Sequence, residues 1–272
     1  MLLLHSGGSS GAQWRKAGEK LTARRLLTPD FYGYGGTDGW DSDETLQHDD
    51  QADLVVAALT HAGLADSTVD VVGHSYGGAG AVRMVLRELA NVRSLVLIEP
   101  MLAPLLAEAG EKKLFGEYEF LAHGFLDRIR KGDERSAWAF FIDYRNGAGT
   151  WNGFPDKTQM RFLGQSAATY QAFESNLANP TSLDDCRTLS LPVTVVCGKK
   201  TTAPDRRVTE LLRDTLPNAQ YVIIPDAEHM SPLTHPEEVA AIIEKANESK
   251  WQGKQQQQFK ILRLLVLLRE HT

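Results

Sequence analysis

The residues best suited to chemistry lie in the segment GHSYGG, residues 73–78, which contains the pattern G-x-S-x-G. The segment follows the apolar run Val69–Val72 and precedes a helical pattern, so it predicts a sharp turn from a strand into a helix. Gly73 and Gly77 would let the strand and the helix pack closely, and the strained serine backbone would project its hydroxyl above the sheet. Ser75 is therefore the candidate nucleophile.

A serine hydroxyl is a weak nucleophile at neutral pH and needs a base within hydrogen-bond reach. Among the eight histidines, His229 is the best candidate, because it lies between the predicted strand Tyr221–Ile224 and a predicted helix that starts near Pro236. Open parallel sheets place ligand-contacting residues at the carboxyl ends of their strands. We therefore expect His229 to accept the proton of Ser75.

Negative charge that develops on a substrate carbonyl oxygen requires hydrogen-bond donors that are already in place. One donor is expected to be the backbone N–H of Tyr76, the residue after the nucleophile. The second is assigned to Gly7, with Gly8 as the alternative, in the loop HSGGSSG at residues 5–11. Such a loop could instead bind phosphate, but the sequence lacks the G-x-x-x-x-G-K-[ST] pattern of phosphate-binding loops.

The elements that must position these residues alternate in a way that is typical of α/β proteins with a parallel sheet. Short apolar runs predict strands, and the amphipathic stretches between them predict crossover helices. The predicted strands are Leu2–Leu4, Leu26–Leu27, Val69–Val72, Leu95–Ile98, Val193–Val196 and Tyr221–Ile224, and the predicted helices are Ala12–Thr22, Thr45–His61, Gly78–Leu89, Asp205–Leu216 and Pro236–Ala246.

Residues 100–188 break this alternation with a helical segment, in which thirteen aromatic residues fall between Phe115 and Phe173. We predict a helical cap that roofs an apolar pocket, although such aromatic side chains also fill the cap's own core. The expected domains are a core of residues 1–99 and 189–247, a cap of residues 100–188 and an atypical tail of residues 248–272. The tail predicts either an amphipathic surface helix or a non-native extension, without a role in the chemistry.

Composition limits the expected partners. A formal net charge of −6 and a pI near 5.8 argue against nucleic acid, and the hydrophobic share of 42% is ordinary for a globular protein. We expect a small-molecule substrate, no nucleic-acid or membrane partner and an undetermined oligomeric state. Cys186 and Cys197 have no Cys/His cluster beside them, so we expect no metal site and interpret both as free thiols of a cytoplasmic protein. The opening residues do not resemble a signal peptide.

Four motifs in this order resemble those of the α/β-hydrolase superfamily over about residues 1–247. HSGG at residues 5–8 resembles the family's H-G-G-G loop, and DFYGYGGT at residues 30–37 resembles its D-x-x-G-x-G-x-S loop. The G-x-S-x-G turn and His229 follow in the expected register. The resemblance implies the α/β-hydrolase fold, with a mostly parallel sheet flanked by helices and a helical cap insertion, and no cofactor. The implied activities include those of esterases, lipases, thioesterases, C–C bond hydrolases and cofactor-free perhydrolases.

The third member of the implied triad is a carboxylate, and its usual place is occupied by a threonine. Many relatives carry an aspartate after the seventh strand in a G-x-x-D pattern, whereas this sequence has GKKT at residues 198–201. Glu99, directly after Leu95–Ile98, is the preferred acid, because the end of the strand beside the nucleophile strand is an alternative location in the superfamily. Asp205 is the second candidate, although Pro204-Asp205 is also a helix-start signal.

A second departure from the resemblance is that Met1 leads directly into what resembles the third of the usual eight strands, so the first two are expected to be missing. Together these features predict a serine hydrolase that cleaves an ester-like bond of a small, largely apolar substrate. Ser75, His229 and Glu99 would act through an acyl-enzyme. The alternatives are a C–C or C–N bond hydrolase or lyase that uses the same serine and histidine, and a ligand-binding protein without activity.

Overall fold

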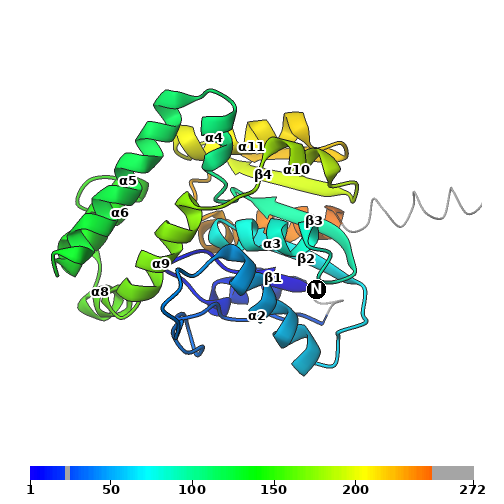
Figure 1. Ribbon diagram of the computed structural model, residues 1–272, viewed down its shortest axis with the longest axis horizontal. Coiled ribbons are helices and arrows are strands. Elements are labelled where there is room, and N and C mark those ends of the chain that lie inside the picture. The colour runs from blue at the N-terminus through cyan, green and yellow to red at the C-terminus, as the bar shows by residue number, and fades with distance from the viewer. Residues whose placement is uncertain (22–24, 247–272) are drawn as a thin grey trace, which may run out of the picture.

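The computed structural model describes residues 1–21 and 25–246, which form a parallel sheet with helices on both faces (Figure 1). The strands follow the order β1-β2-β3-β4-β5, and every neighbouring pair is parallel. These strands confirm the sequence predictions at five places. They are β1 (Leu2–Leu4), β2 (Val69–His74), β3 (Val92–Ile98), β4 (Val193–Gly198) and β5 (Ala219–Ile224).

The sixth predicted strand, Leu26–Leu27, was wrong as a strand and is only an isolated bridge. Leu27 pairs with Leu2 in parallel register at the outer edge of β1. Its N–H donates to the carbonyl oxygen of Met1 at 2.9 Å, and its carbonyl oxygen accepts from the N–H of Leu3 at 2.9 Å. The ladder stops there because the apolar run is short and Pro29 has no N–H with which to continue it.

The strands are apolar on both faces because helices cover both faces. One face packs against α2 (His48–His61), α3 (Tyr76–Leu86) and α11 (Ala203–Thr215). The opposite face packs against η1 (Gly11–Trp14), α1 (Arg15–Gly18) and the helix over residues 236–246. Successive strand residues therefore belong to different cores: Leu2, Val71, Leu95 and Val195 lie in the first core, and Leu3, Val72, Val96 and Val196 lie in the second.

Three helices begin at other residues than predicted, because capping side chains or the preceding turn determine where each helix starts. The helix α2 begins at His48 because Gln47 forms a capping box with Asp50. The helix α3 begins two residues before Gly78, because it continues directly from the turn at Ser75. The helix α11 begins at Ala203, where the Thr202 hydroxyl accepts a hydrogen bond from the N–H of Asp205.

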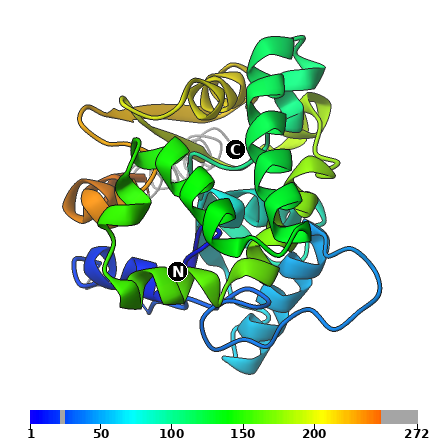
Figure 2. The same ribbon diagram turned by 90° about the vertical axis from the view of Figure 1, so that its left-hand side faces the viewer.

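Residues 100–188 contain helices and no strand, as predicted. Figure 2 views the molecule from the side on which α5 to α9 lie, in front of the sheet. Helices α5, α6 and α9 share an apolar core around Phe125, Trp138 and Phe173, whereas α4 and α10 pack into the core of the sheet. The seven helices are α4 (Pro104–Glu108), α5 (Lys112–Arg130), α6 (Glu134–Asn146), α7 (Thr150–Gly153), α8 (Asp156–Leu163), α9 (Ser166–Leu177) and α10 (Leu183–Thr188).

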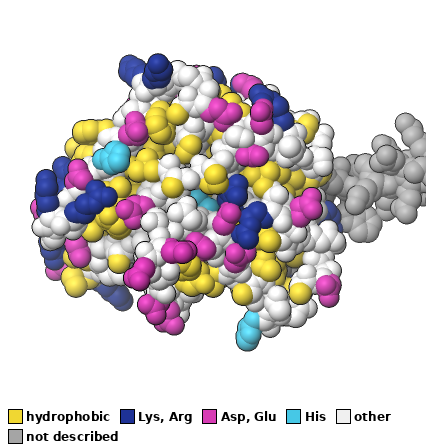
Figure 3. All heavy atoms as spheres, in the orientation of Figure 1, with side chains coloured by type: hydrophobic (Ala, Val, Ile, Leu, Met, Phe, Trp, Pro, Cys, Tyr) yellow, Lys and Arg dark blue, Asp and Glu magenta, His cyan; other side chains and the backbone are white. Residues whose placement is uncertain are grey.

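The surface shown in Figure 3 carries acidic and basic side chains intermixed with apolar ones. Cys186 and Cys197 are buried free thiols. Within residues 1–21 and 25–246, no helix has the length and apolar character that crossing a bilayer requires. The predicted helix Ala12–Thr22 was too long, because the structure has the 3-10 helix η1 followed by α1, which ends at Gly18. The predicted tail of residues 248–272 and residue Thr22 lie outside the described residues.

We expect Gly77→Ala to destabilise the fold. A Cβ atom on Gly77 would lie 2.5 Å from the backbone oxygen of His5 and 2.6 Å from the backbone of Leu4. Because these are backbone atoms, the unfolding free energy should fall by about 3 kcal/mol or more. The matched control is Gly116→Ala in α5, where no described atom outside the helix backbone lies within 4 Å of the new Cβ, and a gain of about 0.5–1 kcal/mol is expected. Urea unfolding measures both, and equal midpoints would contradict the close packing at Gly77.

Candidate active site

Ser75 lies on a strained turn between β2 and α3. Its φ of 53° and ψ of −116° lie outside the regions that residues other than glycine adopt easily. Its N–H donates to the carbonyl oxygen of Ile98 at 3.0 Å, and the N–H of Gly77 donates to that of His5 at 3.0 Å. A Cβ on Gly73 would lie 2.6 Å from the backbone oxygen of Gly77, which confirms the steric role predicted for both glycines.

The structure brings Ser75, His229 and Glu99 into one hydrogen-bonded chain. The distance from Ser75 Oγ to His229 Nε2 is 3.0 Å, and that from His229 Nδ1 to Glu99 Oε2 is 2.8 Å. All three side chains are buried. With Nδ1 donating to the carboxylate, Nε2 is left as the acceptor for the serine hydroxyl, which is the arrangement that a general base requires.

Glu99 is held in place by groups at the end of the neighbouring strand β4. Its Oε1 accepts from the N–H of Gly198 at 2.7 Å, and its Oε2 accepts from the hydroxyl of Thr201 at 2.7 Å. Glu99 has a φ of 42°, so the chain turns sharply as β3 ends. Thr201, at the position where the resemblance implies an aspartate, therefore donates a hydrogen bond to the Glu99 carboxylate.

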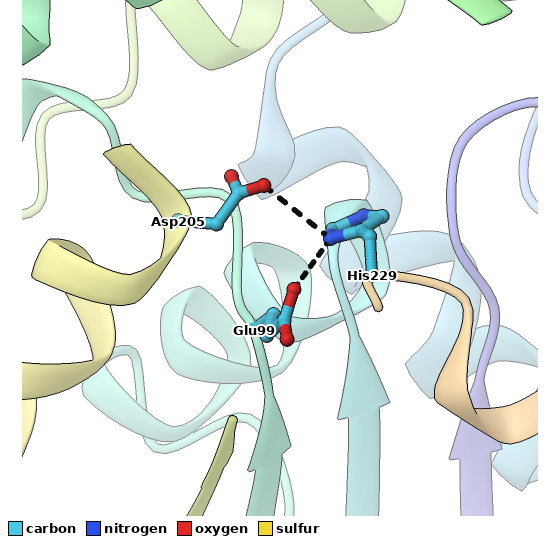
Figure 4. A group of neighbouring side chains, drawn as sticks. All are labelled: Glu99, Asp205 and His229. Carbon is cyan, nitrogen blue, oxygen red and sulfur yellow. Dashed lines mark hydrogen bonds and ion pairs between the residues drawn. The ribbon is translucent and has the colours of Figure 1, made fainter. Parts of the chain in front are cut away.

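Asp205, the second candidate acid, also faces His229 but does not hydrogen-bond it. Figure 4 shows both carboxylates directed at the same ring nitrogen, with Asp205 Oδ2 lying 3.6 Å from His229 Nδ1. Burial opposes the ionisation of Asp205, but the charges of Arg145 and His229 and hydrogen bonds from Thr202 and Arg145 outweigh it, so the pKa of Asp205 lies below its ordinary value. Of the two candidates, Glu99 makes the direct bond.

Arg145 was missed by the sequence analysis. It extends from the last turn of α6, and its Nη1 donates to Asp205 Oδ2 in an ion pair whose side chains are only 5% and 6% exposed. No spacing rule relates residue 145 to residue 205, and a single arginine at a helix end ordinarily indicates a solvated terminus. The burial of this pair is therefore visible only in the folded structure.

Glu99, Asp205 and His229 also form a group of possible metal ligands. Their ligand atoms are already occupied, however, because Glu99 bonds His229 and Asp205 pairs with Arg145. A divalent cation at this place would lie beside the Arg145 guanidinium and would be repelled by it. The group fits the orientation of an imidazole better than it fits a metal.

A second buried network connects two loops of the site through η1 and the end of β2. Gln13 Oε1 accepts from both the N–H and the hydroxyl of Ser6, at 3.2 and 2.8 Å, so the Gln13 amide nitrogen must donate to His74 Nδ1 at 3.1 Å. This leaves His74 Nε2 as the donor to the carbonyl oxygen of His229, at 2.9 Å. Gln13 and His74 thus fix the loop after β1 relative to the loop that carries His229, and the sequence analysis assigned neither of them a role.

A cavity of about 470 Å³ opens above Ser75 and His229. Gly7, Gly8 and Tyr76 line it from the sheet side. The helical segment contributes both apolar and polar side chains to the lining, and the charged residues of the lining are arginines. The aromatic lining residues from the helices are Phe141, Phe154, Phe162 and Phe173, and the arginines are Arg15, Arg145 and Arg161.

A model of the alpha/beta hydrolase family matches residues 1–242. The chain therefore belongs to the alpha/beta hydrolase family, as its motifs and its parallel sheet indicated.

Individual relatives differ in their activities. The chain is 25% identical over 254 residues to a 2-hydroxymuconate semialdehyde hydrolase of Pseudomonas sp. (strain CF600), with 89% of this chain and 84% of that protein covered. It is 23% identical over 260 residues to a pimeloyl-[acyl-carrier protein] methyl ester esterase of Aeromonas salmonicida, with 89% and 93% covered. A thermophilic esterase from Thermogutta terrifontis shares the fold, with a TM-score of 0.72, 22% identity, and 91% and 89% of the two chains covered.

Buried neutral histidines predict that acid destabilises the fold. Burial lowers the pKa of His5 and of His48 to about 4 and holds that of His74 well below its ordinary value. An unfolded histidine takes up a proton near pH 6.5, so this contribution to stability is fully present above pH 6.5 and is lost as the pH falls toward 4. Each histidine should add a slope of about 1.4 kcal/mol per pH unit to the unfolding free energy within that window.

Urea unfolding between pH 7 and pH 4 measures this slope. His48→Gln should reduce the slope by about 1.4 kcal/mol per pH unit, because glutamine does not titrate. Glutamine can still donate a hydrogen bond to Asn176 Oδ1, which His48 Nε2 contacts at 3.0 Å. A variant as pH-sensitive as the parent protein would contradict a buried neutral His48.

Proposed function

We propose that this protein is a serine hydrolase that cleaves an ester-like bond of a small, largely apolar molecule through an acyl-enzyme. One observation carries the proposal: the hydrogen-bonded chain from Ser75 through His229 to Glu99 lies at the floor of a cavity large enough for a small substrate. The reaction needs only groups that the chain itself supplies.

In the proposed reaction, His229 Nε2 accepts the proton of Ser75 as its Oγ attacks the carbonyl carbon of the ester. Glu99 keeps the imidazole oriented and stabilises its protonated form. The imidazolium then gives the proton to the departing alcohol, and the acyl group remains on Ser75. His229 next deprotonates a water molecule that attacks the acyl-enzyme, which releases the carboxylic acid and restores the serine hydroxyl.

Gly7 and Tyr76 are proposed to bind the oxygen of the tetrahedral intermediate. Both line the cavity beside Ser75, and the hydrogen bonds within the described part of the chain use neither of their backbone N–H groups. Gly8, which also lines the cavity, is kept as the alternative second donor. Donors that are free and already positioned stabilise developing charge without a cost of reorganisation.

The helices α5 to α9 are proposed to act as the cap that excludes water and selects substrate. The cap contributes four phenylalanines to the cavity lining, which favours an apolar acyl or alcohol group. The alternative of a ligand-binding protein without activity is motivated by the threonine at position 201, where an aspartate was expected. The hydrogen bond between Glu99 and His229 supports the hydrolase over this alternative.

A C–C bond hydrolase is the second candidate, favoured by the similarity to the 2-hydroxymuconate semialdehyde hydrolase. A screen of substrate turnover separates the two activities. The panel contains neutral esters, esters with a free carboxylate and 1,3-diketone-type substrates. The carboxylate esters are included because the charged residues that line the cavity are arginines. Turnover of the diketones with no turnover of any ester would favour the second candidate.

Covalent labelling tests the nucleophile. A fluorophosphonate probe should modify Ser75 with 1:1 stoichiometry, because the His229 base activates this hydroxyl over others. Mass spectrometry of the labelled peptide identifies the site. Ser75→Ala should abolish labelling, whereas Ser9→Ala, in the same cavity lining but without a histidine partner, should not. A folded parent protein that resists the probe would argue decisively against the proposal.

Amide substitutions test the assignment of the acid. Glu99→Gln should lower kcat by about 100-fold or more with little change in KM, because the imidazole loses its carboxylate partner. Asp205→Asn should cost less than about tenfold at high pH, since Asp205 makes no hydrogen bond to His229. Asp226→Asn is the control, because this exposed carboxylate precedes His229 by three residues and pairs with Lys200. A parent-like kcat in Glu99→Gln would refute Glu99 as the acid.

A further inference from the structure

We propose that the buried pair of Asp205 and Arg145 tunes the proton affinity of His229, the two charges acting on the imidazole in opposite directions. This inference rests on the proposed function, in which His229 is the general base. The triad itself uses neither residue, since Glu99 already occupies the Nδ1 side of the imidazole.

Asp205 is placed to act through its charge. Its Oδ2 lies 3.6 Å from His229 Nδ1, too long for a hydrogen bond but close for two charges. A carboxylate at this distance favours the protonated imidazole. Taken alone, it would raise the proton affinity of His229 and leave less of the neutral base at a given pH.

Arg145 balances this charge. Its guanidinium donates to Asp205 Oδ2, while the Thr202 hydroxyl donates to the same oxygen at 2.8 Å. Both members of the ion pair are buried, so solvent screens their charges little. The positive charge of Arg145 therefore opposes the negative charge of Asp205 beside His229, and removal of either partner leaves the charge of the other unbalanced.

The other groups that face His229 do not add a competing charge. His74 on β2 lies with its ring 5.0 Å from that of His229, but it is neutral because burial holds its pKa well below the ordinary value. Among the described residues, the carboxylates that face the imidazole are Glu99 from the end of β3 and Asp205 from α11, and Arg145 from α6 is paired with Asp205.

The pair also connects the base to the cavity roof. Helix α6 carries Arg145 and also Phe141 and Ile142, which line the cavity. Asp205 belongs to α11, which packs on the sheet. The ion pair therefore joins the helix that lines the cavity to the helix that packs on the sheet, beside the imidazole.

The test measures the rate of fluorophosphonate labelling of Ser75 against pH in the parent protein and three variants. Asp205→Asn leaves the arginine unbalanced and should move the midpoint of the profile down by about one pH unit. Arg145→Met leaves the aspartate unbalanced and should move it up by about one pH unit. The double variant restores neutrality and should return the midpoint to within a few tenths of a unit of the parent.

The matched control is Arg207→Met, which breaks the pair of Arg207 with Glu111, at 2.7 Å, between the same helix α11 and the start of α5. It should leave the midpoint unchanged. Shifts of Asp205→Asn and Arg145→Met in the same direction, or no shift in either, would overturn the proposal. If Arg145→Met does not fold, the near-isosteric Asp205→Asn decides alone, with a downward shift required.

An NMR titration of the His229 ring in a Ser75→Ala background separates this inference from the proposed function. It reports the same midpoints without any reaction at the serine. Labelled Ser75 with identical midpoints in all variants would overturn the inference and leave the proposed function standing. The opposite result is also informative. If the NMR midpoints shift in opposite directions in the two variants but the probe never labels Ser75 of the parent protein, the proposed function is overturned and the inference stands.

Discussion

The structure depends on the close approach of backbone to backbone at the turn after β2. Gly73, Gly77 and Gly78 bring the turn and the start of α3 against β1 and Pro100 at distances that leave no room for a Cβ atom. This packing fixes Ser75 in its strained conformation above the sheet. It also fixes the ends of β1 and β3, because the turn hydrogen-bonds the carbonyl oxygens of His5 and Ile98. The residues on those two strand ends are therefore positioned by the same contact.

The site is a polar network beside the apolar cores of the sheet. It is stabilised because the carboxylate, imidazole and amide groups named below are hydrogen-bonded to one another. Gly198 and Thr201 hold the Glu99 carboxylate, while Gln13 and His74 connect the loops on either side of the nucleophile. The Glu99 carboxylate accepts the hydrogen bond of His229 Nδ1 in this arrangement. The network thus specifies the imidazole tautomer, which a solvated site would leave to exchange.

The helical segment contributes more than a roof of aromatic side chains. Most of those aromatics pack into its own core, and four phenylalanines reach the cavity. It also supplies Arg145, whose ion pair with Asp205 is buried beside the imidazole rather than placed on the surface. A buried pair stabilises a fold little in comparison with apolar residues of similar size, but it costs much when one partner is removed. The position of the Arg145–Asp205 pair beside His229 suits an effect on the protonation of the imidazole.

The sequence by itself determined the parallel sheet, the turn that carries Ser75 and the loop that carries His229. These follow from local patterns: apolar runs of strand length, glycines at fixed spacing and the order of the elements along the chain. The sequence favoured Glu99 as the acid only through the family resemblance, and Asp205 remained a second candidate. The choice depends on which carboxylate lies nearer to His229 Nδ1. Only the tertiary structure decided that, and only it joined Arg145 to Asp205 and Gln13 to His74. Contacts between residues tens of positions apart depend on how the elements pack, and no local spacing records that packing.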